Sequence, residues 1–327
     1  MPLVRRLDVK SKQPHLRGQA DPKAGNISTH PRGWSTRRYF RNFTAAGNRT
    51  VEYYLFTPRE EHAQTATRLP LVCFLHGIGD RIWPRSPFKS LKDDHAPWYV
   101  VCPQAPEATN WALGRYPRDG NKGLPRAWVH VAPHVLLMSL IDHLAASLPI
   151  DRHRVALVGA SMGAYATFDL LGRFPGRIAV AVPIAGGGDP LLAPNMASVS
   201  VWVWHGRQDV KVPLNASRQM VAAVARARGA SLQHVALGTG EVDSQTIEQR
   251  SADDRLRWTE LPSGHMSTIN WVLSQPRLVD WVQLRLRAQV AEDVVVSGRT
   301  CIFAPPVCRL SKDATPCLLL AQSACNA

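Results

Sequence analysis

The chain has 327 residues, of which 45% are hydrophobic and 20% are charged, and its formal net charge is +14. This composition suits a globular protein with a sizeable core, and it excludes a chain that is disordered throughout. No apolar run approaches the roughly 18 residues that a membrane-spanning helix needs. The positive charge is uneven. Residues 1–50 contain eleven Lys/Arg and two Asp/Glu, a net charge of +9, which leaves 14 − 9 = +5 for the rest of the chain.

The basic segment 1–50 has two interpretations. The first, which we favour, is a solvated and largely disordered extension. The second is an arm that binds nucleic acid or an anionic membrane surface. The segment lacks the apolar stretch of a secretory signal, and Asp8 and Asp21 disfavour a transit peptide. We therefore expect a cytoplasmic protein.

From about residue 51 to residue 290, apolar runs rich in β-formers alternate with helix-like segments. The runs expected to form strands are 53–58, 71–77, 98–104, 155–161, 178–186, 201–206 and 256–262. The segments expected to form helices are 132–148, 163–174, 215–229 and 277–290. This alternation predicts one α/β domain over residues 51–290, with a mostly parallel, doubly wound sheet and helices on both faces.

The cysteines divide between this domain and the C-terminal tail. Cys73 and Cys102 lie within apolar runs, where we expect buried, reduced thiols. The tail, residues 291–327, holds the other four cysteines, none at the C-x-x-C spacing of a zinc or redox site. We assign the tail no role.

Two long connections, residues 78–97 and 105–128, each follow a predicted strand. Both leave the carboxyl end of the sheet, where open α/β folds bind their ligands. Trp83 and Trp111 lie in these connections, and we expect them to be ordered side chains that contact a substrate.

The chemistry-bearing motif is G-x-S-x-G, formed by residues 159–163 around Ser161. It follows an apolar β run directly and precedes a helical pattern directly, which is the strand–turn–helix setting in which such a serine is a nucleophile. Gly159 and Gly163 permit the sharp turn and the close approach of helix and strand. The alternative is an ordinary βα turn that contains a harmless serine.

A serine hydroxyl needs a base, and a neutral imidazole is suited to that at neutral pH. Among twelve histidines we favour His265, because it follows a late predicted strand, in the chain order Ser…Asp/Glu…His of this type of sheet. His130 and His134 lack the glutamate of a zinc motif, so we predict no metal site. His205 ends a strand, where a structural or hydrogen-bonding role is expected.

The base in turn needs a carboxylate that fixes its tautomer. Asp209 lies in a turn after the strand 201–206, between Ser161 and His265 in the chain. The rival acids are Asp189, which comes too soon after the preceding strand, and the acids of the polar stretch 238–255, which we predict to be a solvated loop. Those acids are Asp243, Asp253 and Asp254.

Acyl transfer also requires hydrogen-bond donors for the developing oxyanion. One backbone N–H is expected from Met162, the residue after the nucleophile. The other is expected from the turn that follows the strand 71–77, where Ile78 is the first candidate and Gly77 the second. His76, in the same turn, is a candidate for substrate contact.

Taken together, these segments resemble the esterase and predicted-peptidase branch of the α/β hydrolases, related to feruloyl esterases and polyester depolymerases. The matching pieces are PLVCFLHGIGD, VVCPQAPEATNW, IDRHRVALVGASMGAYATFDL, AVPIAGGGDP, VWVWHGRQDVKVP and LPSGHMSTINWV, in the family's order over roughly residues 51–285. The resemblance implies the three triad roles for Ser161, Asp209 and His265, and a tryptophan near the pocket at Trp111. Ala164 departs from the family, whose members often have glycine there.

The sequence thus predicts a serine hydrolase that cleaves a small ester through an acyl-enzyme, without a metal or organic cofactor. Two alternatives stay open. One is a serine peptidase that acts on short peptides, because the same three residues serve both reactions. The other is a non-catalytic binding protein on a hydrolase scaffold, which uses residues 1–50 to hold a polyanion.

Overall fold

The structure is a computed structural model that describes residues 38–45, 49–58, 68–78, 97–105, 111, 133–236 and 245–297. The described elements up to Val290 belong to one compact unit, residues 1–290. Residues 291–297 belong to a second unit, residues 291–327.

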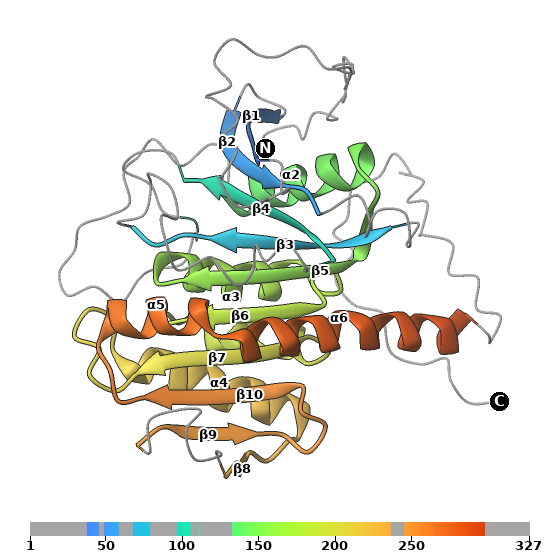
Figure 1. The fold of residues 1–327 in the computed structure, drawn as a ribbon. Coiled ribbons are helices and arrows are strands. Elements are labelled where there is room, and N and C mark those ends of the chain that lie inside the picture. Colours follow the sequence, from blue (N-terminus) through green and yellow to red (C-terminus); the bar gives the residue numbers. More distant parts are fainter. Residues whose placement is uncertain are drawn as a thin grey trace, which may run out of the picture. The chain divides into compact units, whose positions relative to one another are not determined.

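The described strands form one mixed sheet of ten strands, and this confirms the predicted α/β class (Figure 1). Its spatial order is β1-β2-β4-β3-β5-β6-β7-β10-β9-β8. The six central strands, from β4 to β10, run parallel, and the pairs at both edges are antiparallel. The strands are β1 (Arg38–Ala45), β2 (Arg49–Phe56), β3 (Leu69–Leu75), β4 (Tyr99–Gln104), β5 (Ile150–Ala160), β6 (Val180–Ile184), β7 (Ser200–Gly206), β8 (Gln233–His234), β9 (Ile247–Arg250) and β10 (Leu256–Leu261).

Helices cover both faces of this sheet. The described helices are α2 (Pro133–Ser147), α3 (Met162–Arg173), the 3-10 helix η2 (Pro190–Met196), α4 (Leu214–Arg228), α5 (His265–Ser274) and α6 (Pro276–Ser297). The apolar residues of α2, α3 and α4 share one buried cluster with one face, and those of α5 and α6 share a second cluster with the other face (Figure 1). The sheet is therefore sandwiched between two helical layers.

The residues of β3 explain why a strand in this position is apolar throughout. Leu71, Cys73 and Leu75 belong to one cluster, and Val72 and Phe74 belong to the other. Successive side chains of a strand point to opposite faces, so a strand covered on both faces needs apolar residues at every position. Burial raises the pKa of the Cys73 thiol to about 12, and Cys73 and Cys102 are both buried, as predicted.

All seven runs predicted to be strands contain a strand of the sheet, and all four predicted helices are present. Two predictions need correction. The domain was expected to begin at residue 51, but the sheet already begins with β1 at Arg38, inside the predicted extension. The stretch 238–255 was expected to be a solvated loop, but it contains β9, in which Glu248 is buried. In both strands, charged residues interrupt the apolar pattern.

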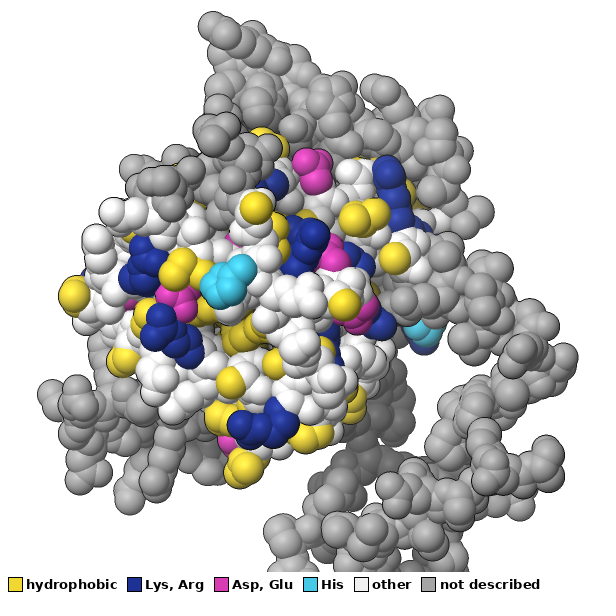
Figure 2. Space-filling view, turned by 90° about the horizontal axis from the view of Figure 1, so that it is seen from below, with side chains coloured by type: hydrophobic (Ala, Val, Ile, Leu, Met, Phe, Trp, Pro, Cys, Tyr) yellow, Lys and Arg dark blue, Asp and Glu magenta, His cyan; other side chains and the backbone are white. Residues whose placement is uncertain are grey.

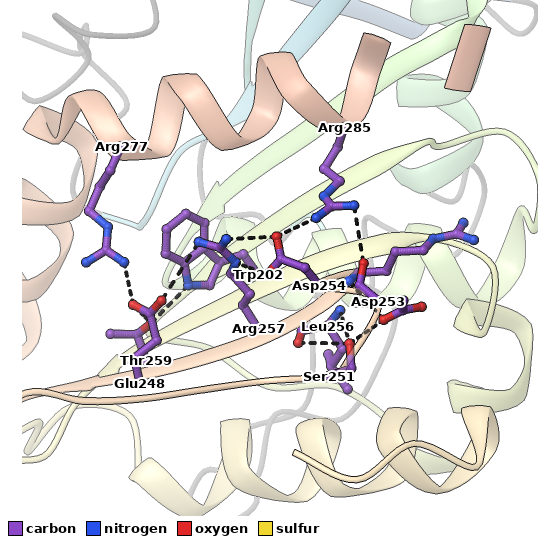
Figure 3. A network of polar contacts seen from close by, with 11 residues as sticks. Trp202, Glu248, Ser251, Asp253, Asp254, Leu256, Arg257, Thr259, Arg277 and Arg285 are labelled. Atoms are coloured by element: carbon purple, nitrogen blue, oxygen red, sulfur yellow. Dashed lines mark hydrogen bonds and ion pairs between the residues drawn. The ribbon is translucent and has the colours of Figure 1, made fainter. Parts of the chain in front are cut away.

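Glu248 is buried because basic side chains from neighbouring elements surround it (Figure 3). Its Oε2 accepts hydrogen bonds from Arg277 Nη2 at 2.6 Å and from Thr259 Oγ1 at 3.2 Å. The Arg277 and Arg257 guanidinium groups also lie 5.1 and 4.7 Å from the centre of the Trp202 ring. These contacts join α6 to β7, β9 and β10.

The described surface seen from the β8–β9 edge carries basic, acidic and apolar side chains interspersed with one another (Figure 2). In the described part of the chain, every helix is too short or too polar to span a bilayer.

Candidate active site

Ser161 occupies the single position between the end of β5 at Ala160 and the start of α3 at Met162. Its backbone has φ 54° and ψ −114°, in the positive-φ region that residues other than glycine rarely adopt. Its N–H donates to the carbonyl of Ile184 on β6 at 2.8 Å, which anchors the strained turn to the neighbouring strand. The turn lifts the side chain away from the sheet at the end of the strand.

Two glycines let the chain pass through this turn. A Cβ on Gly159 would lie 2.2 Å from the backbone oxygen of Gly163, and a Cβ on Gly163 would lie 1.9 Å from the oxygen of Leu75. At Gly186 the nearest atom belongs to a side chain and not to the backbone, because a Cβ there would lie 2.4 Å from the Cβ of Ala164. Gly186 therefore accommodates the alanine that replaces the glycine common in the resembled family.

The structure brings Ser161, His265 and Asp209 into contact. His265 Nε2 lies 3.0 Å from Ser161 Oγ, and His265 Nδ1 lies 2.5 Å from Asp209 Oδ2. Ser161 follows β5, His265 follows β10 and Asp209 follows β7. The carboxyl ends of these three parallel strands lie on the same side of the sheet (Figure 1). His265 is the first residue of α5, a helix that was not among the predicted ones, and its ring is almost wholly buried.

Asp209 is held on both carboxylate oxygens. Its Oδ1 accepts the backbone N–H groups of Lys211 at 2.8 Å and Val212 at 2.9 Å. Burial by itself would raise the pKa of Asp209, but hydrogen bonds from His205, His265 and these two N–H groups together lower it far below its usual value. The carboxylate is therefore ionised at neutral pH and can orient His265 through Nδ1.

The other acids considered as partners for His265 have separate roles. Asp189 accepts the N–H of Leu191 at the start of η2. Asp253 accepts a hydrogen bond from Ser251, and Asp254 pairs with two arginines of β10 and α6, Arg257 and Arg285. Asp243 lies outside the described residues.

His76 and Trp111 pack against each other, with their ring centres 5.2 Å apart. His76 Nδ1 lies 2.7 Å from the Gly77 oxygen, His76 Nε2 accepts the N–H of Ala105 at 3.0 Å, and Trp111 Nε1 donates to the His76 oxygen at 3.2 Å. Each residue is only 2% exposed, which leaves little surface for a substrate. The two side chains hold the turn at residues 76–78, and their contact with a substrate stays a prediction. Trp83 lies outside the described residues.

The turn at residues 76–78 lies beside the start of α3, because Leu75 at the end of β3 touches Gly163. Gly77 is buried, and the Ile78 side chain is 54% exposed. Met162 is the first residue of α3, at the helix end where backbone N–H groups point outward along the axis. The candidate donors Met162, Ile78 and Gly77 thus belong to two adjoining segments next to Ser161.

The described residues contain no cluster of three or more His, Cys, Asp or Glu that could hold a metal ion. His134 lies 3.8 Å from Asp169, and its pKa is lowered by burial. His130 lies outside the described residues.

His205 was predicted to have only a general structural or hydrogen-bonding role, and no contact with Asp209 was predicted. His205 Nε2 lies 3.3 Å from Asp209 Oδ2, and both side chains are wholly buried. The feature of the sequence that could have indicated this contact was a histidine in the largely apolar strand β7. Its partner Ser217, on α4, gave no signal in the sequence, because a serine on a helix is usually a surface residue.

No protein-family model and no curated protein matches the sequence. Among solved structures, a thermostable esterase matches with a TM-score of 0.57 and 22% identity, over 76% of this chain and 63% of the esterase. This chain thus spans less than two thirds of that esterase. An acetyl xylan esterase from Aspergillus awamori matches with a TM-score of 0.52 and 15% identity, over 69% of this chain and 93% of its own.

A glucuronoyl esterase from Solibacter usitatus matches with a TM-score of 0.53 and 12% identity, over 84% of this chain and 88% of its own. At these identities the likeness establishes the arrangement of strands and helices, and a fold of this kind serves many reactions. The chain therefore has the α/β-hydrolase fold, which it shares with these esterases.

Proposed function

We propose that this protein is a serine hydrolase that cleaves small carboxylic esters through an acyl-enzyme. The observation that carries the proposal is the continuous contact from Ser161 through His265 to Asp209, at 3.0 and 2.5 Å. A hydroxyl, an imidazole and an ionised carboxylate in this order are the groups that acyl transfer requires. The likeness to esterases in fold supports an ester substrate.

In the first half of the reaction, His265 Nε2 takes the proton of Ser161 as Oγ attacks the ester carbonyl carbon. The N–H groups of Met162 and of Ile78 or Gly77 stabilise the negative oxygen of the tetrahedral intermediate. The intermediate collapses, His265 returns the proton to the departing alkoxide, and an alcohol leaves the acylated serine. A water then repeats these steps, so that the carboxylic acid is released and the serine hydroxyl is restored.

Asp209 keeps its negative charge throughout. It accepts a hydrogen bond from the Nδ1–H of His265, which leaves Nε2 free to act as base, and it stabilises the imidazolium that forms in each half-reaction. An ester is a better substrate than an amide for this arrangement, because an alkoxide leaves more readily than an amine. A peptidase acting on short peptides is the alternative, and parallel assays on aminoacyl esters and the corresponding peptides distinguish the two.

Labelling with a fluorophosphonate probe tests the proposal directly. We expect the wild-type protein to be labelled and the Ser161→Ala variant not to be, because only an activated serine attacks the phosphorus. Ser263→Ala is a control that keeps Ser161 and should still be labelled. A folded wild-type protein that resists the probe would contradict the proposal and favour a non-catalytic binding protein. For such a protein, binding of a polyanion through residues 1–50 should weaken steeply with added salt.

Three exposed apolar side chains favour an apolar group on the substrate. Ile78, Val210 and Met266 are 54%, 96% and 42% exposed, and each lies next in sequence to a residue of the candidate site. A substrate that covers them gains the free energy of removing apolar surface from water. We expect kcat/KM to rise with acyl chain length or with an aromatic acyl group, and Val210→Ser to weaken that rise. Equal rates for short, long and aromatic acyl esters would contradict this preference.

A further inference from the structure

His205 is a wholly buried histidine at the end of β7, and it contacts the same oxygen of Asp209, Oδ2, as His265 does. Both nitrogens of its ring have partners. Nε2 lies 3.0 Å from the backbone oxygen of Val212 and 3.3 Å from Asp209 Oδ2, and Nδ1 lies 2.7 Å from Ser217 Oγ. The protonation of the ring follows from what each of these partners can accept or donate.

On the Nε2 side, both partners are acceptors only. The carbonyl oxygen of Val212 has no proton, and Asp209 is an ionised carboxylate that already accepts from His265 and from two backbone N–H groups. A lone pair on Nε2 would therefore face two negatively polarised oxygens. Nε2 of His205 must carry a proton.

On the Nδ1 side, the partner is a hydroxyl whose single proton is already used. Ser217 Oγ lies 2.5 Å from the backbone oxygen of Gly186, which is the separation of a short O–H···O bond. Without a proton between them, two oxygens at this distance would repel each other. Because Ser217 donates its proton to Gly186, it can only accept from His205, and Nδ1 must also carry a proton.

The surrounding charges allow a buried imidazolium. In the parallel pairing of β7 and β10, Glu260 is the partner of His205, but Arg218 of α4 already pairs both of its carboxylate oxygens. Asp209 therefore supplies the negative charge in contact with His205. Among the described residues, His265 on α5 also contacts Asp209, and the pKa of Tyr165 on α3 is raised by burial and by the charge of Asp209.

We propose that His205 is held as an imidazolium, with both ring nitrogens protonated, and that it is a positioning residue for Asp209. It holds Oδ2, the carboxylate oxygen that His265 also contacts, and its positive charge offsets part of the negative charge that Asp209 presents to His265. The protonation of His205 stands on the hydrogen-bond geometry alone, and its effect on catalysis rests on the proposed serine mechanism.

The sign of this effect follows from electrostatics. A positive charge beside Asp209 disfavours a second positive charge on His265, so His265 stays neutral, and able to act as base, down to lower pH. If the charge is removed, His265 is protonated at higher pH. The acid limb of the kcat/KM profile then moves upward, although the side chains in contact with substrate are unchanged.

The first test reads the ring protons directly, without any assay of activity. In protein labelled with nitrogen-15 histidine, a two-dimensional spectrum of the imidazole groups near neutral pH should show a ring with both nitrogens protonated. That ring should be absent from the spectrum of His205→Gln. In Ser217→Ala, which removes the acceptor opposite Nδ1, His205 should lose its Nδ1 proton at lower pH than in the wild type. An unprotonated His205 nitrogen in the folded wild type near neutral pH would overturn the proposal.

The second test measures the effect on the reaction. Glutamine at position 205 retains a donor in place of Nε2 but carries no charge, so we expect the acid limb of kcat/KM in His205→Gln to move to higher pH by about one unit. Ser217→Ala should move it in the same direction, and it serves as the test if His205→Gln fails to fold. If the acid limb of the kcat/KM profile moves in neither variant, the proposed effect of His205 on His265 is wrong. A wild-type protein without hydrolytic activity would contradict the proposed function instead, and the spectra would still decide the state of His205.

Discussion

Gly163 and Leu75 are in direct backbone contact, because a Cβ on Gly163 would lie 1.9 Å from the Leu75 oxygen. We expect Gly163→Ala to lower the free energy of unfolding by about 2–3 kcal/mol, since the obstacle is a strand backbone that cannot rotate away. Urea unfolding measures this change. Gly264→Ala is the control, because its Cβ would meet only the Gln208 oxygen at an ordinary 3.7 Å. Equal stability of the two variants would show that the contact can relax.

The backbone of Ser161 is strained, and the strain can be separated from the loss of the hydroxyl. Ser161→Gly and Ser161→Ala both remove the nucleophile, but only glycine adopts φ 54° without a steric penalty. We expect the glycine variant to be more stable than the alanine variant by about 1 kcal/mol. This difference is the strain energy that glycine relieves minus the cost of the greater freedom of glycine in the unfolded chain. Thermal or urea unfolding provides the comparison. An alanine variant as stable as the glycine variant would mean that the strain is no larger than the entropic cost of glycine, and would contradict the expected difference.

Asp209 should make the free energy of unfolding depend on pH in acidic solution. Its pKa is lower in the folded protein than in the unfolded chain, so its ionised form stabilises the fold at any pH above the unfolded value of about 3.9. That contribution is lost as the pH falls through the folded value. We expect the wild type to exceed Asp209→Asn in stability near neutral pH, and the difference to shrink in acid. Urea unfolding at a series of pH values checks this, and a difference independent of pH would contradict it.

Glu248 is expected to matter more for stability than an exposed acid. Glu248→Ala leaves Arg277 and Arg257 beside a buried space without their shared carboxylate, and we expect a loss of about 3 kcal/mol. Asp142→Ala is the matched control, because Asp142 pairs with Arg177 at the exposed surface. There we expect a loss under about 1 kcal/mol. Similar losses in the two variants would show that burial of the Glu248 pair contributes nothing extra.

Much of the architecture was predictable because it is encoded locally. A strand covered on both faces is apolar at every position, and β3 shows this pattern within seven residues. The motif around Ser161 is equally local, since strand, turn and helix are adjacent in the chain. The order of the chain then singled out His265 and Asp209, and the structure brings both into contact with Ser161 as a connected set.

The edges of the sheet were harder to predict. β1 and β9 carry charged residues that look like solvated chain in the sequence. β1 is stabilised by pairing with β2, and β9 by pairing with β10, where Arg257 is the register partner of Arg250. Neither the backbone pairing nor the arginines that neutralise Glu248 can be inferred from a window of a few residues.

The sequence by itself determined the fold class, the candidate nucleophile and the order of its partners, because each depends on local patterns and on their order along the chain. Only the tertiary structure decided the roles of His76, Trp111 and His205. His76 and Trp111 meet across 35 positions of the chain, and His205 meets Ser217 across 12. Whether such a side chain contacts a substrate, holds a loop or carries a buried charge depends on which atoms the register of the sheet places opposite it.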